Sequence, residues 1–420
     1  MRRSKYRIGV RIAVVGGGAA GFFGAIAAAS GNPSAQVVIL EATRQPLQKV
    51  RISGGGRCNV THHCLEPREL SKGYPRGAKE LLGPFTRFGP RETVEWFEAH
   101  GVRLKAENDG RMFPVTDQSS TVVDCLLRAA SDAGIHLRLG ANVKHLSAQA
   151  APNSGFEIEL TDGSRESYDR VLLATGGNPA GCRVAASLGH TITPCVPSLF
   201  TFNVQDPRLA GLAGISFDKV ALTLSDGNGK PLKEAGPLLI THWGLSGPAV
   251  LKLSAWGARI LAERKYHASL TVNFIPDYRP AQAQQELLAF KAANGRKRIV
   301  SARLFGIPTR YWTRLVHHAG IADDMLWANL STKALASLVA ELTTARFAVS
   351  GKGIFKEEFV TCGGVALGEV DFRTMQSKLV PGLYFAGEIL DIDGITGGFN
   401  FQSAWTTGWL AGQALSQPEY

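Results

Sequence analysis

The sequence predicts an α/β fold in which both ends of the chain contribute strands to one parallel sheet. Residues 11–15 form an apolar stretch that runs into a glycine-rich turn and then a helix of small residues. Residues 171–177 and 383–388 are further apolar stretches that run into glycine, and the first is typical of a parallel strand that faces a ligand. Residues from about 195 to 355 differ, because short strands separated by Gly, Pro and Asp turns precede a helical part.

The turn after the first strand carries a dinucleotide-binding pattern. Gly16, Gly18 and Gly21 satisfy the spacing G-x-G-x-x-G. The first glycine permits a tight turn, the second lets the backbone approach a pyrophosphate, and the third lets the helix pack on the strand. A second strand at 36–40 ends at Glu41, whose carboxylate can hold ribose hydroxyls. The pattern therefore predicts a dinucleotide ligand.

A second glycine cluster near the C-terminus favours FAD as that ligand. Gly397 and Gly398 directly precede a helix that is expected from Phe401 onwards. Glycines at such a position bring backbone amides and the positive end of the helix close to an anionic group, such as the edge of a reduced flavin. Asp391 and Asp393 either cap the turn before this helix or contact the flavin, and capping is the favoured interpretation.

The expected organisation is a discontinuous Rossmann-like FAD-binding domain with an insertion. The expected parts are an FAD-binding domain (1–194), an inserted antiparallel β-barrel (195–278), a helical basic subdomain (279–344), a return strand of the barrel (345–358) and the rest of the FAD-binding domain (359–420). Trp243 and Trp256 are expected in the core of the barrel.

The composition excludes several classes of protein. The 420 residues are 45% hydrophobic and 19% charged, which favours a globular enzyme of two or three domains over a disordered chain. No stretch approaches the roughly eighteen consecutive apolar residues of a membrane span, so none is expected. The six cysteines show no C-x-x-C and no zinc spacing, so we expect no metal site and a reducing compartment, the cytoplasm.

The formal net charge of +11 is unevenly distributed along the chain. Between residues 279 and 318, eight Lys and Arg residues accompany a single acid, Glu286. This run has two interpretations: a solvated helical face, or a surface that attracts a polyanion such as RNA. The candidate RNA-binding residues are Arg296, Lys297, Arg298 and Arg303.

An unusual block at residues 49–61 adds chemistry to the nucleotide pattern. Three consecutive glycines would let backbone amides press against a flat ring, while Arg57 and Asn59 supply hydrogen-bond donors beside it. Together with the other glycine motifs, this block resembles the BaiN/RdsA family of FAD-dependent, NAD(P)H-linked oxidoreductases, also labelled aminoacetone-oxidase-like. The other segments that carry the resemblance are 110–114, 242–248, 362–365 and 387–400. Residues 242–243 and 255–259 are most similar to the plant and cyanobacterial branch of that family.

The resemblance implies FAD as cofactor, NAD(P)H as a transient co-substrate and reduction of an activated C=C bond. Uridine in ribosomal RNA or its precursor, converted to dihydrouridine, is the first expected substrate, because the basic insertion supplies a reason to bind a polyanion. A small-molecule enone reductase, an amine oxidase and a flavin-containing RNA-binding factor with little turnover are the alternatives. The expected compartment is the cytoplasm, or the stroma if the chain is of plastid origin.

The expected active site combines the two ends of the chain. Its catalytic candidates are Arg57, Cys58 and Asn59. Cys58 has three interpretations: a structural thiol beside the flavin, a proton donor, or half of a redox pair with Cys64. The residues expected to bind the cofactor are Gly16, Gly18, Ala19, Ala20, Gly21, Glu41, Lys49, Gly55, Gly56, Arg57, Cys58, Asn59, Val143, Thr175, Gly176, Gly387, Glu388, Gly398, Asn400 and Phe401.

Overall fold

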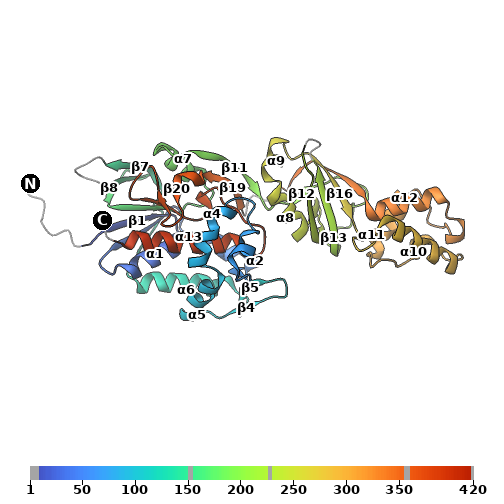
Figure 1. Cartoon of the computed structure of the whole chain (residues 1–420), viewed down its shortest axis with the longest axis horizontal. Coiled ribbons are helices and arrows are strands. Elements are labelled where there is room, and N and C mark those ends of the chain that lie inside the picture. Colours follow the sequence, from blue (N-terminus) through green and yellow to red (C-terminus); the bar gives the residue numbers. More distant parts are fainter. Residues whose placement is uncertain (1–8, 150–154, 226–228, 354–359, 418–420) are drawn as a thin grey trace, which may run out of the picture. The chain divides into compact units, whose positions relative to one another are not determined.

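The computed structural model describes residues 9–149, 155–225, 229–353 and 360–417. The chain forms two compact units (Figure 1). Unit 1 comprises Met1–Val196 and Phe359–Tyr420, and unit 2 comprises Pro197–Glu358. Residues 354–358 of the expected return strand lie outside the described residues.

Unit 1 is built on a seven-stranded sheet whose strands come from both ends of the chain. The strand order is β20-β21-β22-β10-β1-β2-β6, and the pairs from β22 to β6 are parallel. The central strand β1 pairs through Val14 with Leu172 on one side and Ile39 on the other. The strands are β1 (Arg11–Val15), β2 (Gln36–Glu41), β6 (His136–Leu139), β10 (Arg170–Leu173), β20 (Val370–Asp371), β21 (Gln376–Ser377) and β22 (Leu383–Phe385).

Helices α1 (Ala19–Gly31) and α13 (Phe399–Ser416) lie side by side in unit 1 (Figure 1). A Cβ atom on Gly408 would lie 2.6 Å from the backbone oxygen of Ala20, and one on Gly412 would lie 2.4 Å from that of Gly24. The two backbones therefore approach each other more closely than larger side chains allow. This packing joins the first helix of the chain to the last.

The other elements of unit 1 surround this core. Their sheets are β3-β5-β4, β7-β8-β9 and β11-β19. The elements are α2 (Gln48–Gly56), β3 (Thr61–His62), α3 (Pro67–Ser71), α4 (Ala78–Arg87), α5 (Pro90–Ala99), β4 (Leu104–Ala106), β5 (Arg111–Pro114), α6 (Ser119–Asp132), β7 (Val143–Gln149), β8 (Gly155–Leu160), β9 (Arg165–Tyr168), α7 (Pro179–Ser187), β11 (Ile192–Ser198), β19 (Val360–Val365), η3 (Leu367–Glu369) and η4 (Gly387–Ile389).

Unit 2 contains one antiparallel sheet of seven strands in the order β17-β16-β13-β14-β15-β12-β18. The two edge strands β17 and β18 are separated in sequence by Ser350 alone, so the sheet must curl until its edges meet, as a barrel does. The strands are β12 (Phe202–Asn203), β13 (Ser216–Ser225), β14 (Leu232–Ile240), β15 (Gly244–Ser246), β16 (Ala268–Asn273), β17 (Ala345–Val349) and β18 (Gly351–Lys352).

The helical part of unit 2 packs around buried aromatic side chains. Tyr311, Trp312 and Trp327 are completely or almost completely buried there. By contrast, Trp243 and Trp256 are 59% and 38% exposed, so their expected place in the barrel core was wrong. The helices are α8 (Pro248–Trp256), α9 (Ala258–Glu263), α10 (Pro280–Ala293), η1 (Ile299–Ser301), α11 (Thr309–His318), η2 (Trp327–Asn329) and α12 (Thr332–Thr343). Within the described residues, no helix combines the length and the apolar character needed to cross a bilayer.

Candidate functional site

The carboxyl ends of four parallel strands meet at one edge of the unit 1 sheet. The Gly16–Gly18 turn follows β1, and Glu41 ends β2. Thr175 and Gly176 follow β10, while Gly387 and Glu388 follow β22. Ligands of open α/β sheets bind at this edge, near the strand where the order reverses, which here is β1. The fold therefore brings the expected cofactor residues of both chain ends to one place.

The glycines of the first turn differ in what surrounds them. A Cβ atom on Gly16 would lie 2.4 Å from the Ala174 oxygen, and one on Gly21 would lie 1.9 Å from the Gly16 oxygen. These two glycines are therefore needed for the fold itself. Gly18 has no atom within 4 Å of such a Cβ, and its extended backbone does not require glycine. Its open space lies at the positive N-terminal end of α1, which begins at Ala19.

Glu41 closes the turn from the neighbouring strand. Its Oε2 accepts a hydrogen bond of 2.7 Å from the Gly17 amide, and its Oε1 accepts one of 2.8 Å from the Thr43 amide. The Ala141 amide donates to the Glu41 backbone oxygen at 2.8 Å. Val143, an expected cofactor residue, begins β7 two residues after Ala141. The carboxylate is thus held in a fixed position beside the turn, with lone pairs left to accept from a ligand hydroxyl.

The glycine block begins as a helix. In α2 the regular backbone ends at Ser53, and Gly54 and Gly55 adopt the left-handed conformation with φ of 58° and 69°. A Cβ atom on Gly55 or Gly56 would meet nothing within 4 Å. The end of α2 therefore presents open backbone rather than side chains, as expected of a surface that receives a flat ring.

The thiol of Cys58 is buried directly after this block. Its backbone is left-handed, with φ of 60°, and its amide donates to the Ser53 oxygen at 3.0 Å. Burial raises the pKa of the Cys58 thiol to about 12, so the thiol is neutral near pH 7. Cys58 and Cys64 are both free in this structure. A catalytic role for Cys58 remains a prediction.

The Arg57 guanidinium is held by acidic and aromatic neighbours. It donates to Glu107 at 2.7 Å and to Asp117 at 3.2 Å, and it stacks 3.8 Å above the centre of the Phe113 ring. The hydrogen bond to Glu107 is the main reason that the pKa of Arg57 is raised. Asn59 is 9% exposed, and its backbone amide nitrogen lies 3.1 Å from where a Cβ atom of Gly54 would stand. Roles for Arg57 and Asn59 at the flavin ring remain predictions.

Lys49 and Glu388 connect the block to the C-terminal element. Lys49 Nζ lies 2.6 Å from Glu388 Oε2, and the lysine side chain is 50% exposed while the glutamate is 15% exposed. The same carboxylate lies 4.0 Å from where a Cβ atom of Gly176 would stand. Three expected cofactor residues from three separate segments are therefore neighbours.

Helix α13 carries polar residues that sequence reasoning missed. Thr407 Oγ1 accepts from the Gly387 amide at 2.9 Å, and Trp405 Nε1 donates to the Val60 oxygen at 2.8 Å. Gln402 Oε1 accepts from Thr61 and Thr93, at 2.5 and 3.0 Å. Their only signal in the sequence is a polar side chain on a helix that is otherwise apolar. They fasten the glycine block and Gly387 to the last helix.

The residues at the start of α13 shape the preceding loop. Gly398 is left-handed with φ of 95°, and a Cβ atom there would lie 2.4 Å from the Thr61 oxygen. Asn400 exchanges two hydrogen bonds with Gly394, at 2.8 and 2.9 Å. The Phe401 ring stacks on Trp405, with centroids 5.6 Å apart. A direct contact of these side chains with the cofactor remains a prediction.

Asp393 links the C-terminal loop to an earlier part of the chain. It is fully buried and forms an ion pair with Arg76, a residue that no sequence pattern singled out. The N-cap position of α13 itself is occupied by Gly398. Asp393 therefore joins the C-terminal loop to the segment between α3 and α4, and its capping of the turn before α13 remains a prediction.

One buried polar atom at the sheet edge has no partner within the protein. Thr175 Oγ1 has no hydrogen bond to any atom of the described residues, although it is buried. Buried hydroxyls without a partner are costly, so such an atom indicates a ligand at this edge. Together with the open backbone at Gly18, Gly55 and Gly56, this atom makes the donor and acceptor set fit FAD.

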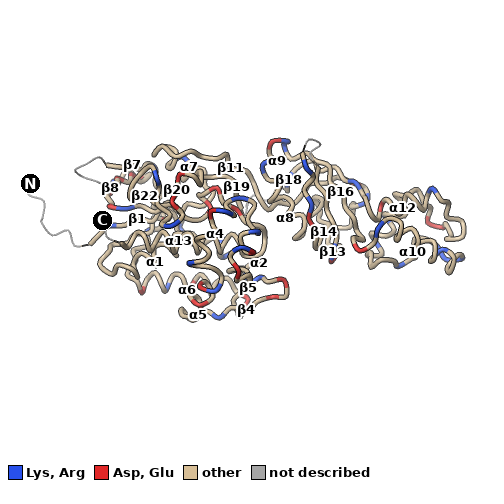
Figure 2. Tube along the Cα trace, viewed as in Figure 1, with Lys and Arg blue, Asp and Glu red and all other residues tan. Residues whose placement is uncertain are grey.

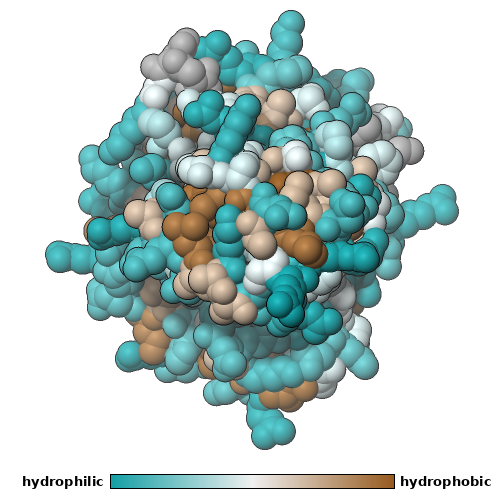
Figure 3. Space-filling model, turned by 90° about the vertical axis from the view of Figure 1, so that its right-hand side faces the viewer, coloured by the Kyte–Doolittle hydropathy of each residue, from teal (hydrophilic) through white to brown (hydrophobic). Residues whose placement is uncertain are grey.

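The expected RNA-binding residues lie in unit 2. Arg296, Lys297 and Arg298 occupy the turn between α10 and η1, and Arg303 follows η1; all four are exposed. Figure 2 shows the Lys and Arg positions along this part of the chain, and Figure 3 shows that the face at this end is largely hydrophilic, with a limited hydrophobic area. The nearby Arg310 and Arg314 instead donate to the backbone oxygens of Gly211 and Ala210.

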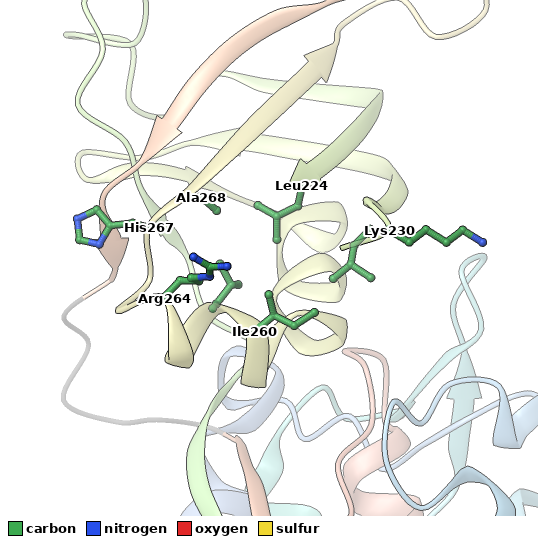
Figure 4. A pocket seen from close by; sticks show the side chains of 8 residues that line it. Leu224, Lys230, Ile260, Arg264, His267 and Ala268 are labelled. Atoms are coloured by element: carbon green, nitrogen blue, oxygen red, sulfur yellow. The ribbon is translucent and has the colours of Figure 1, made fainter. Parts of the chain in front are cut away.

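A small pocket in unit 2 contains none of the expected cofactor residues (Figure 4). Its floor is apolar, and the Lys230 side chain extends away from it. The lining residues are Leu224, Lys230, Leu232, Ile260, Leu261, Arg264, His267 and Ala268. In the described part of the chain, no three His, Cys, Asp or Glu side chains gather as a metal site would require.

Comparison with known proteins identifies the family and the fold of this chain. The model of the HI0933-like protein Rossmann domain matches residues 10–414. A 3-dehydro-bile acid Δ4,6-reductase of Clostridium scindens is 33% identical over 97% of this chain and 99% of that protein. A ribosomal RNA dihydrouridine synthase of Escherichia coli is 29% identical over 96% and 97%. A solved 3-ketosteroid Δ4-(5α)-dehydrogenase of Rhodococcus jostii covers 99% of this chain and 98% of its own, with 15% identity and a TM-score of 0.52.

The fold and the site define a Rossmann-type flavoprotein oxidoreductase with a discontinuous cofactor domain. The chain belongs to the HI0933-like family, which is the BaiN/RdsA family that its motifs resemble, and which consists of FAD-dependent oxidoreductases. The expected family, fold class and enzyme class are therefore confirmed.

Proposed function

We propose that this flavoenzyme uses NAD(P)H to reduce an activated C=C bond, and that its substrate is uridine in ribosomal RNA or its precursor. The observation that carries the choice of RNA is the exposed cluster Arg296, Lys297, Arg298 and Arg303 in unit 2. No ion pair for these four side chains is present among the described residues, so their charge is available to phosphates. Two relatives named ribosomal RNA dihydrouridine synthase, from Escherichia coli and Haemophilus influenzae, match almost the whole chain.

Different residues of unit 1 would bind different parts of the cofactor. The open backbone at Gly18 and the start of α1 would bind the pyrophosphate, and Glu41 would hold a ribose hydroxyl. Thr175 Oγ1 would gain the partner that it lacks, and Lys49 and Glu388 would close one side of the cradle. FAD, when bound, supplies hydride transfer to and from the substrate.

The glycine block would determine how the ring is held. Gly55 and Gly56 offer backbone without side chains, and the buried Asn59 packs against the neighbouring Gly54. Arg57 is fixed by Glu107, Asp117 and Phe113, so its remaining N–H groups have a defined direction. Cys58 is a neutral thiol, so it contributes packing or a proton rather than a thiolate.

The second candidate function is reduction of a small-molecule enone. A specific observation favours it, because the relative with 33% identity is named a bile-acid reductase. Under this alternative the basic turn of unit 2 would serve solubility only. An RNA substrate would in turn place the protein in a compartment with ribosomes, the cytoplasm or the stroma of a plastid.

The two functions are separated by one assay on the purified holoenzyme. The enzyme and NADPH or NADH are incubated with an unmodified transcript of large-subunit ribosomal RNA, and dihydrouridine is mapped by mass spectrometry of nuclease fragments. We expect a gain of two hydrogens at a defined uridine. Parallel incubation with a steroid 4,6-dien-3-one measures enone reduction. Turnover of the steroid without any modified uridine would contradict the proposed substrate.

The salt dependence of RNA binding tests the basic turn directly. Replacing Arg296, Lys297 and Arg298 together by Ala should lower RNA affinity. Each phosphate interaction that the substitution removes should reduce the slope of log K against log salt by about one unit or slightly less. The matched control removes three exposed cations of unit 1, Lys79, Arg91 and Arg128. FAD content should stay unchanged in both variants. Equal RNA binding of the two variants would favour the small-molecule reductase.

A further inference from the structure

Two cysteine sulfurs of unit 1 lie in contact outside the cofactor motifs. Cys182 Sγ lies 3.8 Å from Cys195 Sγ. Cys182 belongs to α7 and is buried, whereas Cys195 belongs to β11 and is exposed. A disulfide requires the sulfurs to approach to about 2 Å, so the two side chains must rotate toward each other to form one. One thiol of the pair is accessible from solvent, and the other lies directly behind it.

Helix α7 rests on the loop that contains the unpaired hydroxyl. It starts at the Asn178 cap, whose side chain accepts from the Ala180 amide at 2.9 Å, directly after Thr175–Gly177. Gly181, the neighbour of Cys182, packs so closely on Thr175 that a Cβ atom there would lie 1.8 Å from Oγ1. A displacement of Cys182 therefore changes the packing around Thr175.

Strand β11 is connected to the same loop through strand β19. Its Pro194 and Cys195 pack against Gly363 of β19, where a Cβ atom would lie 2.4 Å from the Pro194 oxygen. On the same strand β19, Thr361 packs against Gly177, where a Cβ atom would lie 2.3 Å from Oγ1. In the sequence, β11 also runs from unit 1 into unit 2, whose first residue is Pro197. Cys182 thus stands on α7, which contacts the Thr175 loop directly, and Cys195 stands on β11, which is connected to that loop through β19.

We propose that Cys182 and Cys195 form a reversible intrachain disulfide by exchange with a small-molecule disulfide, and that this bond restrains the Thr175 loop. The Cys195 thiolate attacks the small disulfide, and one thiolate leaves. Cys182 then attacks Cys195 Sγ and displaces the second thiolate. The two cysteines are oxidised, the small disulfide is reduced, and the two protons end on the two released thiols.

The surroundings of the pair keep it reduced until an oxidised partner arrives. Although Cys195 is exposed as a residue, partial shielding of its sulfur from water, together with the adjacent Cys182 and the charge of Asp391, raises the pKa of the Cys195 thiol to about 11. Few thiolates are therefore present near neutral pH, and exchange is slow unless the disulfide is abundant. Asp391 belongs to the C-terminal loop, so the pair borders the cofactor element as well.

Peptide mapping of the folded holoenzyme tests the disulfide itself. The wild-type protein is treated with oxidised glutathione, remaining thiols are alkylated, and proteolytic peptides are compared with and without dithiothreitol. We expect a peptide that links Cys182 to Cys195 and disappears on reduction. In the control variant Cys64→Ser, which removes a partly exposed cysteine elsewhere, the same link should form. A stable glutathione adduct on Cys195 without any cross-link would overturn the proposal.

Hydrogen exchange tests the effect on the loop. In the cross-linked wild type, amides of residues 175–183 should exchange several-fold more slowly than in the reduced protein. The variant Cys195→Ser, treated in the same way, should exchange like the reduced wild type before and after treatment. Equal exchange of the oxidised and reduced wild type over these residues would overturn the restraint on the loop.

Discussion

Lys49 Nζ lies 2.6 Å from Glu388 Oε2, although 339 positions separate the two residues. The lysine stands on α2, at the start of the glycine block, and the glutamate follows the last strand of the sheet. The pair therefore joins the two chain segments that the cofactor would span. Because the lysine is half exposed, the pair contributes little to global stability, about 1 kcal/mol or less.

Breaking this pair should weaken FAD binding more than it weakens the fold. We expect Lys49→Met and Glu388→Gln each to lower FAD affinity about two- to fivefold, which corresponds to the usual energy of an exposed ion pair. The double variant should show little further loss, since the second change removes an interaction that is already broken. Fluorescence titration of the apoprotein with FAD measures all three values, and fully additive losses would show that the residues act independently.

A substitution at Gly18 can separate an effect on cofactor binding from an effect on folding. A Cβ atom at Gly18 meets nothing in the protein, and the backbone is extended, so Gly18→Ala should leave the melting temperature of the apoprotein nearly unchanged. If a pyrophosphate approaches this backbone, the methyl group should lower FAD affinity about tenfold or more. Gly83→Ala in α4 is the matched control, because its Cβ also enters open space. Unchanged FAD affinity in Gly18→Ala would place the pyrophosphate elsewhere.

Asn59 tests whether the glycine block holds the ring. Asn59 is buried and packs against Gly54 of the glycine block, so Asn59→Ala should shift the visible spectrum of the flavin or slow its reduction by NAD(P)H. The amount of FAD bound should fall only in part, because the turn at Gly18 and Glu41 is untouched. Asn294→Ala in unit 2 serves as control. A wild-type spectrum together with wild-type reduction kinetics in Asn59→Ala would show that the glycine block does not contact the flavin ring.

His190 should make the stability of unit 1 depend on pH. Its side chain is 4% exposed, its Nε2 lies 2.8 Å from Ser377 Oγ, and burial lowers the pKa of the imidazole below its usual value. The unfolded chain therefore binds a proton before the folded chain does, and stability falls as the pH drops below about 6.5. This contribution is fully present above that pH.

Urea unfolding at about pH 7.5 and about pH 5 measures the effect. The free energy of unfolding of the wild type should decrease at the lower pH, whereas His190→Gln should lose less over the same interval, because it has no proton to take up. His100→Gln replaces an exposed histidine and should behave like the wild type. Identical pH dependence of wild type and His190→Gln would assign the effect to other groups.

The parts of the fold that follow from local pattern were predictable. Apolar stretches that end in glycine correctly located β1, β10 and β22, and the G-x-G-x-x-G spacing located the turn before α1. Predicting α1 and α13 required only their small or apolar residues and the glycines before them. The partners of charged residues were not predictable, because Arg76 and Asp393, like Arg57 and Glu107, meet only after the chain has folded.

The class of this protein could be predicted from sequence alone: a split α/β cofactor domain, an FAD-type turn and a basic insertion. These features depend on residues that are close in the chain, through glycine's backbone freedom, the length of apolar stretches and local charge. The contact of Lys49 with Glu388, the absence of a partner for Thr175 Oγ1 among the described residues, and the exposure of Trp243 became visible only in the folded structure. The first two depend on distances between distant segments that the packing of α1, α13 and the parallel sheet establishes in unit 1, and the exposure of Trp243 depends on the packing of unit 2.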